Sequence, residues 1–182
     1  MAKVGYRKPY YKLLGTEGTA EAKSAGMGVR CEVTINAPET KLYADDGVAE
    51  SVREFVDGSI TAEFDDISPD VMADLTGAKA GVGNELIFNA DDVPPFVRFG
   101  YINKRIKNSL ASWRVTMYYK VQFSTPGDSS ETKGQNTTFK TDSLSGSIFR
   151  DDAGNWKYQK DFATLSEAET ALKAIVKSGA AS

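Results

Sequence analysis

Residues 113–123, WRVTMYYKVQF, alternate apolar and polar side chains over eleven positions. A repeat of two is the side-chain period of a β-strand, so this segment predicts a strand about twice the usual length of ~5–6 residues. A long strand needs a long partner, and residues 136–141 are the next candidate along the chain. The alternation places Tyr118 with Arg114 and Lys120 on one side. The apolar side, predicted to pack in the core, carries Trp113, Val115, Met117, Tyr119, Val121 and Phe123.

Shorter segments with the same period predict further strands at 29–36, 59–65, 83–89, 97–102, 145–150 and 156–160. The last two flank the turn-rich residues 151–155, which suggests a hairpin. Cys31 falls on an apolar strand face, where a small buried thiol is expected rather than a reactive one.

Two helices are predicted, one between the strands at 59–65 and 83–89 and one after the last strand. Ser68 and Pro69 are typical of a helix start, and Gly77 of its end. Thr164 with Glu167 forms a capping-box pattern, followed by an apolar stripe at helical spacing up to Gly179. The expected fold class is therefore mainly β with a flanking helix (α+β).

The 182 residues are enough for one domain. Residues 1–28 are rich in Gly, Ala and Ser after an aromatic start, and we predict an N-terminal arm there. The domain proper is expected over 29–178, with a short tail at 179–182. Within it, 39–58 reads as a long acidic loop with several apolar anchors, of the kind that packs on its own domain or on another chain.

The composition argues against an enzyme, a cofactor or a metal centre. Histidine is absent, which removes the commonest general base and metal ligand, and Cys31 is the single cysteine. Acidic pairs occur at 45–46, 65–66, 91–92 and 151–152, but turns favour Asp for its backbone hydrogen bonds, and none has the EF-hand spacing. The N-terminus lacks the apolar segment of a secretory signal, and no apolar run approaches the ~20 residues of a membrane span.

Charge is distributed unevenly along the chain. Residues 39–97 have a balance of −11, whereas residues 98–160 have a balance of +6. A basic cluster lies in FGYINKRIKN, residues 99–108. Both blocks are compatible with solvated faces, but they also suit complementary contacts between copies, which give rings or filaments.

The segment KLYADDGVAESVREFVDGSITAEFDDIS, residues 41–68, followed by a short helix, resembles the core of major tail proteins of long-tailed bacteriophages. PPFVRFGYI, WRVTMYYKVQF, TKGQNTTFKT and FATLSEAETAL occur in the same order as in that family, and the resemblance covers roughly residues 29–176. It implies an antiparallel β-sandwich or open barrel packed on a helix, in a virion protein that forms hexameric rings. The strands of the subunits would join in an inter-subunit β-barrel. Such rings stack into the tail tube through which DNA enters the host.

The resemblance also implies partners. These are further copies of the chain, a tape-measure protein in the lumen, and the tail terminator and distal tail proteins. DNA would pass without specific binding, no membrane would be involved, and assembly would take place in the host cytoplasm. An acidic or neutral lumen repels phosphates, so we expect Glu32, Glu63 and Asp65 to face the channel and the basic face at Arg114 and Lys120 to point away.

The long loop is the predicted contact with the neighbouring ring. The residues assigned to this interface are Leu42, Tyr43, Asp45, Asp46, Arg53 and Phe55. Alternatives from other classes are a sugar- or receptor-binding surface module, a related secretion-tube ring protein, and a carboxylate-based glycosidase.

Overall fold

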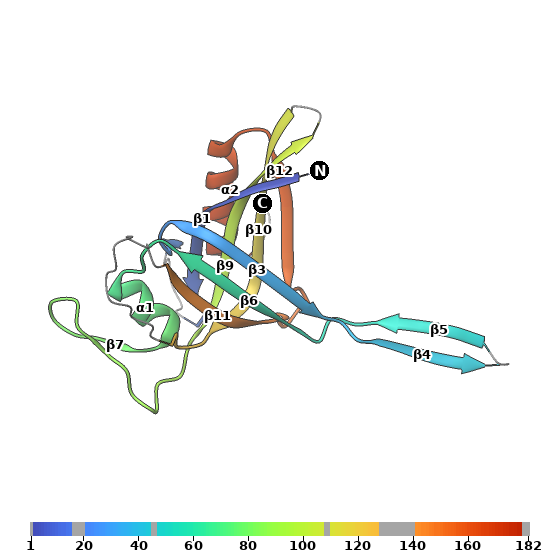
Figure 1. Ribbon diagram of the computed structural model, residues 1–182, viewed down its shortest axis with the longest axis horizontal. Helices are drawn as coiled ribbons and strands as arrows, with labels where there is room; N and C mark the ends of the chain where they lie inside the picture. The colour runs from blue at the N-terminus through green and yellow to red at the C-terminus, as the bar shows by residue number, and fades with distance from the viewer. Residues whose placement is uncertain (1, 16–20, 45–46, 108–109, 128–140, 180–182) are drawn as a thin grey trace, which may run out of the picture.

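The computed structural model describes residues 2–15, 21–44, 47–107, 110–127 and 141–179, and it is mainly antiparallel β-sheet with two helices (Figure 1). The α+β class predicted from the sequence is therefore confirmed. The strands of the main sheet are β1 (Ala2–Leu13), β2 (Lys23–Ser24), β3 (Gly28–Asn36), β6 (Asp57–Phe64), β9 (Phe96–Lys107), β10 (Leu110–Phe123), β11 (Asp142–Phe149) and β12 (Lys157–Phe162). The remaining elements are the strand pairs β4 (Glu39–Ala44) with β5 (Gly47–Arg53) and β7 (Lys79–Ala80) with β8 (Leu86–Ile87), and the helices α1 (Pro69–Thr76) and α2 (Leu165–Ser178).

The main sheet runs in the order β2-β1-β9-β10-β11-β6-β3, with β12 added beside β10. The long strand predicted at 113–123 is β10, and it lies at the centre of this order. Its first half pairs with β12 and its last residues pair with β11, while β9 runs along its other edge. One long strand thus joins the two halves of the sheet.

Both faces of β10 are buried, but the predicted alternation is broken in the middle. The pairing of β10 with β9 shifts register between Tyr118 and Val121. Before the shift, Val115 and Met117 pack under α2; after it, Val121 and Phe123 enter the second core on the opposite face. Tyr118 belongs to that second core and is 1% exposed, so its predicted place outside the core is wrong.

Residues 145–150 and 156–160 do form strands, but they do not form the predicted hairpin. β11 pairs with β10 through Phe149 and Lys120, whereas β12 pairs with an earlier part of β10. The turn between them is tight, with Asp151 N–H donating to the Asn155 carbonyl at 2.7 Å. The predicted partner of β10 at 136–141 lies outside the described residues except for Thr141. The strand predicted at 83–89 is reduced to Leu86–Ile87.

The predicted N-terminal arm is wrong for residues 2–13. They form β1, which pairs with β9, and Tyr11 is fully buried in the core. Tyr6 packs edge-on against Tyr101 with 5.0 Å between ring centroids. This segment is therefore part of the sheet.

Both helices lie where their sequence signals predict them, although the Ser68 side chain makes no capping hydrogen bond at the start of α1. In α2, the Thr164 side chain accepts from Glu167 N–H while the Glu167 carboxylate accepts from Thr164 N–H, and Gly179 ends the helix at φ 72°. Ala168, Leu172, Ile175 and Val176 are the buried residues of the helix. Gly100 of β9 allows this close packing, because a Cβ there would lie 2.7 Å from a Leu172 methyl group. Among the described helices, none is long and apolar enough to cross a membrane.

Candidate assembly surface

The strands β3, β6 and β11 present a flat polar face on the side opposite the core. Their registers place Arg30 beside Glu63 and Glu32 beside Thr61, with β11 continuing the rows. Ile60, Ala62 and Phe64, which alternate with the polar positions of β6, are buried in the core as the sequence predicts. The outward positions of the three strands are Arg30, Glu32, Thr34, Asn36, Asp57, Ser59, Thr61, Glu63, Ser143, Ser145 and Ser147.

This polar face holds two of the predicted lumen residues, Glu32 and Glu63, on neighbouring strands. Arg30 pairs with Glu32, and the Asn36 amide donates to the Asp57 carboxylate at 2.8 Å. The face is net acidic, because it carries the carboxylates of Glu32, Asp57 and Glu63 and the single guanidinium of Arg30. Hydroxyl and amide side chains fill the rest, so the face offers many weak polar contacts and no row of cations to hold a phosphate.

The outer edge of β3 ends the sheet. β3 pairs with β6 on one side, and no described strand pairs with its other edge. Along this nine-residue strand, the alternate N–H and C=O groups that point away from β6 are therefore not bonded to any described strand, and they lie beside the polar face. Such an edge is a template for another strand.

The segment predicted as a long loop at 39–58 is for the most part a two-stranded hairpin that prolongs β3 and β6. β4 and β5 pair from Glu39 with Arg53 to Ala44 with Gly47. Val56 N–H donates to the Asn36 carbonyl at 3.1 Å, which links the two paired regions. Figure 1 shows the hairpin projecting from the body of the molecule. The sequence lacks a clear apolar–polar alternation here, because Leu42 and Tyr43 are adjacent and the register shifts between them.

The residues predicted to contact the neighbouring ring lie at different places along this hairpin. Leu42 and Tyr43 lie on β4, opposite Glu50 and Val48 of β5. Asp45 and Asp46 lie outside the described residues. Arg53 makes a contact within the hairpin, where its guanidinium lies 3.1 Å from the Glu39 carboxylate. Hydrogen bonds from Ser51, and then from Arg53, lower the pKa of Glu39.

Phe55 anchors the base of the hairpin to its own chain. Its ring is parallel to that of Trp156, with an interplanar angle of 2° and 4.7 Å between centroids. Both rings are partly buried, and the Lys157 ammonium lies 5.7 Å from the Trp156 centroid. Phe55 therefore contacts its own chain and orients the hairpin, whereas the sequence predicts a contact with the neighbouring ring of subunits. Nothing in the sequence pattern had linked it to Trp156.

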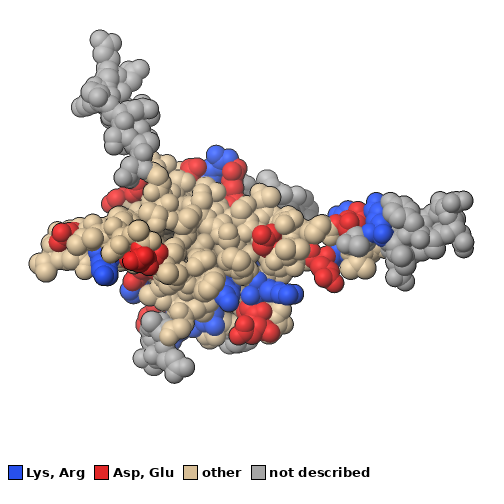
Figure 2. Space-filling model, turned by 90° about the horizontal axis from the view of Figure 1, so that it is seen from below, with Lys and Arg blue, Asp and Glu red and all other residues tan. Residues whose placement is uncertain are grey.

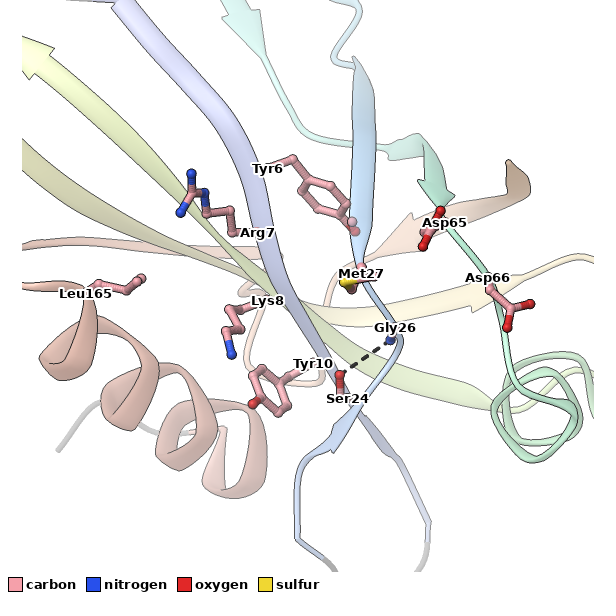
Figure 3. A pocket seen from close by; sticks show the side chains of 11 residues that line it. Tyr6, Arg7, Lys8, Tyr10, Ser24, Gly26, Met27, Asp65, Asp66 and Leu165 are labelled. Atoms are coloured by element: carbon pink, nitrogen blue, oxygen red, sulfur yellow. Dashed lines mark hydrogen bonds between the residues drawn. The ribbon is translucent and has the colours of Figure 1, made fainter. Parts of the chain in front are cut away.

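The third predicted lumen residue, Asp65, follows β6 and lines a cavity of about 700 Å³. Figure 3 shows Asp65 and Asp66 on one side of this cavity and Arg7 and Lys8 on the other, with the Tyr6 ring between them. The cavity opens between β1, the start of β3 and the start of α2. Asp65 therefore lies beyond the end of the polar face that holds Glu32 and Glu63.

The basic residues predicted to face away from the polar face lie on β10. Arg114 makes two hydrogen bonds to Asp161, of 2.5 and 2.7 Å, and Arg105 adds a third of 2.9 Å. The bonds from Arg114, then its charge with that of Arg105, lower the pKa of Asp161. Lys120 lies within the register shift, with its ammonium 4.4 Å from the Phe96 ring centroid. Neither basic residue is on the polar face.

Cys31 behaves as the predicted structural thiol. It is partly buried against the core, and this burial raises its pKa to about 12. The hydrogen bond with Tyr101 opposes the rise, and the charge of Glu32 adds to it. Among the described residues, no three His, Cys, Asp or Glu side chains gather as a metal site requires.

The sequence matches no protein-family model, and no curated protein matches it. Assignment to a family therefore stays a proposal that rests on the residues and on the geometry above.

Proposed function

We propose that this protein is a structural, non-enzymatic tail tube protein of a long-tailed bacteriophage. Copies lie side by side in a ring, rings stack, and the hollow polymer conducts the genome into the host. The observation that carries the proposal is the net acidic polar face of β3, β6 and β11, bordered by the unpaired β3 edge.

The unpaired edge gives a reason for assembly. Backbone groups at a sheet edge bond another strand with directional, regularly spaced contacts, so identical copies add in one register. If each copy lends β3 and β6 to a common wall, the polar face becomes the lining. Glu32 and Glu63 then repel DNA phosphates at the surface past which the DNA slides.

The hexameric ring and the inter-subunit β-barrel are the finer parts of this proposal. So are the tape-measure protein in the lumen, the tail terminator and distal tail proteins at the ends, and the virion tail as the location. A secretion-tube ring would use the same surface, and the presence of the protein in purified phage particles distinguishes the two.

The projecting hairpin offers a clean test. Replacing residues 37–56 with Asn-Gly joins Asn36 and Asp57, which already pair, by a two-residue turn of the type that suits a β-hairpin. We expect this variant to fold, with circular dichroism like that of the parent, and to form no long polymers. Light scattering and negative-stain electron microscopy measure polymerisation. Normal tubes from the shortened protein would refute a role of the hairpin in assembly.

A further inference from the structure

The two ends of β9 carry opposite charge. The strand spans twelve residues, so at about 3.3 Å per residue its ends lie almost 40 Å apart. At one end it follows α1 and the β7–β8 region; at the other it turns into β10 (Figure 1). We call the first the α1 end, residues 65–95, and the second the β9–β10 turn end, the described residues 103–107 and 110–114.

The α1 end is strongly acidic. Residues 65–95 hold seven Asp or Glu and one Lys. Asp66, Glu85 and Asp91 are exposed, and none of them has an ion-pair partner among the described residues. Figure 2 shows acidic side chains at this end, at the left of the view.

The β9–β10 turn end is basic. Residues 103–114 hold four Lys or Arg and no acidic residue. Arg105 and Arg114 both pair with Asp161, whose single negative charge offsets one of their two positive charges. Lys104 has an aromatic neighbour, with its ammonium 5.7 Å from the Trp113 centroid, and no acidic partner in the described part of the chain.

Both ends also expose large apolar side chains. At the α1 end Val82 is 97% exposed and Val93 is 76% exposed, with Phe88 half-exposed between them in sequence. At the turn end Leu110 is 76% exposed and Ile106 is 39% exposed. Apolar side chains surrounded by charge are the usual make-up of a protein interface, with a dry centre and a polar rim.

We infer that the α1 end of one copy docks on the β9–β10 turn end of a second copy, in a head-to-tail contact. Two α1 ends repel each other, as do two turn ends, so charge selects the heterologous arrangement. A contact of this type repeats from copy to copy, and it builds a filament where the rotation between copies does not close a ring. The inference rests on the proposed self-assembly and gives it a stacking contact separate from the β3 edge and the hairpin.

Charge reversal at each end tests the contact. The acidic-end variant carries Glu85→Lys and Asp91→Lys, and the basic-end variant carries Lys104→Glu and Lys107→Glu. Matched controls are Asp152→Lys and Arg150→Glu, which reverse exposed charges in the β11–β12 turn. Each variant alone should associate at least about tenfold more weakly than the parent in low salt, as sedimentation velocity measures. The controls should associate like the parent.

Mixing the two variants gives the decisive result. The reversed α1 end of one variant then meets the reversed turn end of the other with opposite charges again, so the mixture should regain polymers that neither variant forms alone. Raising the salt from about 0.05 to 0.5 M should weaken the association of the parent, because exposed charges are screened.

The remaining outcomes contradict one claim or the other. A parent that never exceeds a small discrete species overturns the proposed function, and this inference with it. A parent that polymerises while both reversed variants polymerise equally well overturns the head-to-tail contact alone. Variants that fail singly and are not rescued by mixing also overturn it, because the reversed charges then do not meet each other.

Discussion

The stack of Phe55 on Trp156 should determine how firmly the hairpin is held. Truncating a fully buried Phe costs about 3–5 kcal/mol, so a partly buried ring at this site should cost about 2 kcal/mol in Phe55→Ala. For a chain of this size that corresponds to a fall of roughly 4–8 °C in Tm. Trp156→Ala should have a similar effect, because it removes the same contact from the other side.

The double variant isolates the stack itself. Offset or parallel ring pairs contribute about 0.5–1.5 kcal/mol beyond their burial, so the double variant should lose about 1 kcal/mol less than the sum of the two single losses. Urea unfolding of dilute, unassembled protein measures all three changes. Phe88→Ala, at a half-exposed ring on the β7–β8 side, is the control and should change stability by about 0.5 kcal/mol or less.

Amide hydrogen exchange provides a local measurement on the same variants. Val56 N–H, which donates to the Asn36 carbonyl at the base of the hairpin, should exchange faster in Phe55→Ala than in the control. Additive single losses together with unchanged exchange at Val56 would refute the role of this stack as the anchor.

Three further predictions concern the body of the molecule. Leu172→Ala should cost about 2–5 kcal/mol in urea unfolding, because the side chain is fully buried between α2 and the sheet; a loss below about 1 kcal/mol would mean that the helix packs elsewhere. Because the pKa of Asp161 is lowered in the folded protein, its ion pairs stabilise the fold above the unfolded pKa of about 3.9, and this stabilisation is lost as the pH falls through the folded pKa. The loss in free energy of unfolding that Asp161→Asn causes at pH 7 should therefore shrink towards pH 2. A loss independent of pH would contradict the ion pairs. Cys31, with a pKa of about 12, should react with a thiol reagent at pH 8 only on unfolding, and rapid labelling of native protein would show that the thiol is exposed.

Sequence patterns predicted the elements whose signals are local. The α2 capping box and Gly179 fix both ends of that helix, and strict alternation in 59–65 places Ile60, Ala62 and Phe64 in the core. The polar face follows from the same alternation, which is why Glu32 and Glu63 could be grouped before their strands were seen to pair.

Backbone irregularities account for the main errors. β1 changes register twice, with Gly5 at φ 79° and Lys8 at φ 53°, and this destroys the period of two that would have shown Tyr11 as buried. The register shift after Tyr118 has the same effect in β10, where the positions that enter the second core change from even, at Tyr118, to odd, at Val121 and Phe123. Bulges insert a residue into one strand only, so a pattern read along the chain cannot follow them.

Contacts between residues far apart in the sequence account for the remaining errors of prediction. The stack of Phe55 on Trp156 joins residues a hundred positions apart, and no local pattern specifies it. The separation of β11 from β12 has the same origin, because both strands find their partners on β10.

Negative-stain electron microscopy of the concentrated full-length protein tests the central claim most directly. The account predicts rings with an open centre, alone or stacked into tubes of constant diameter. A field of solid, separate particles of one chain's size at every concentration would contradict it.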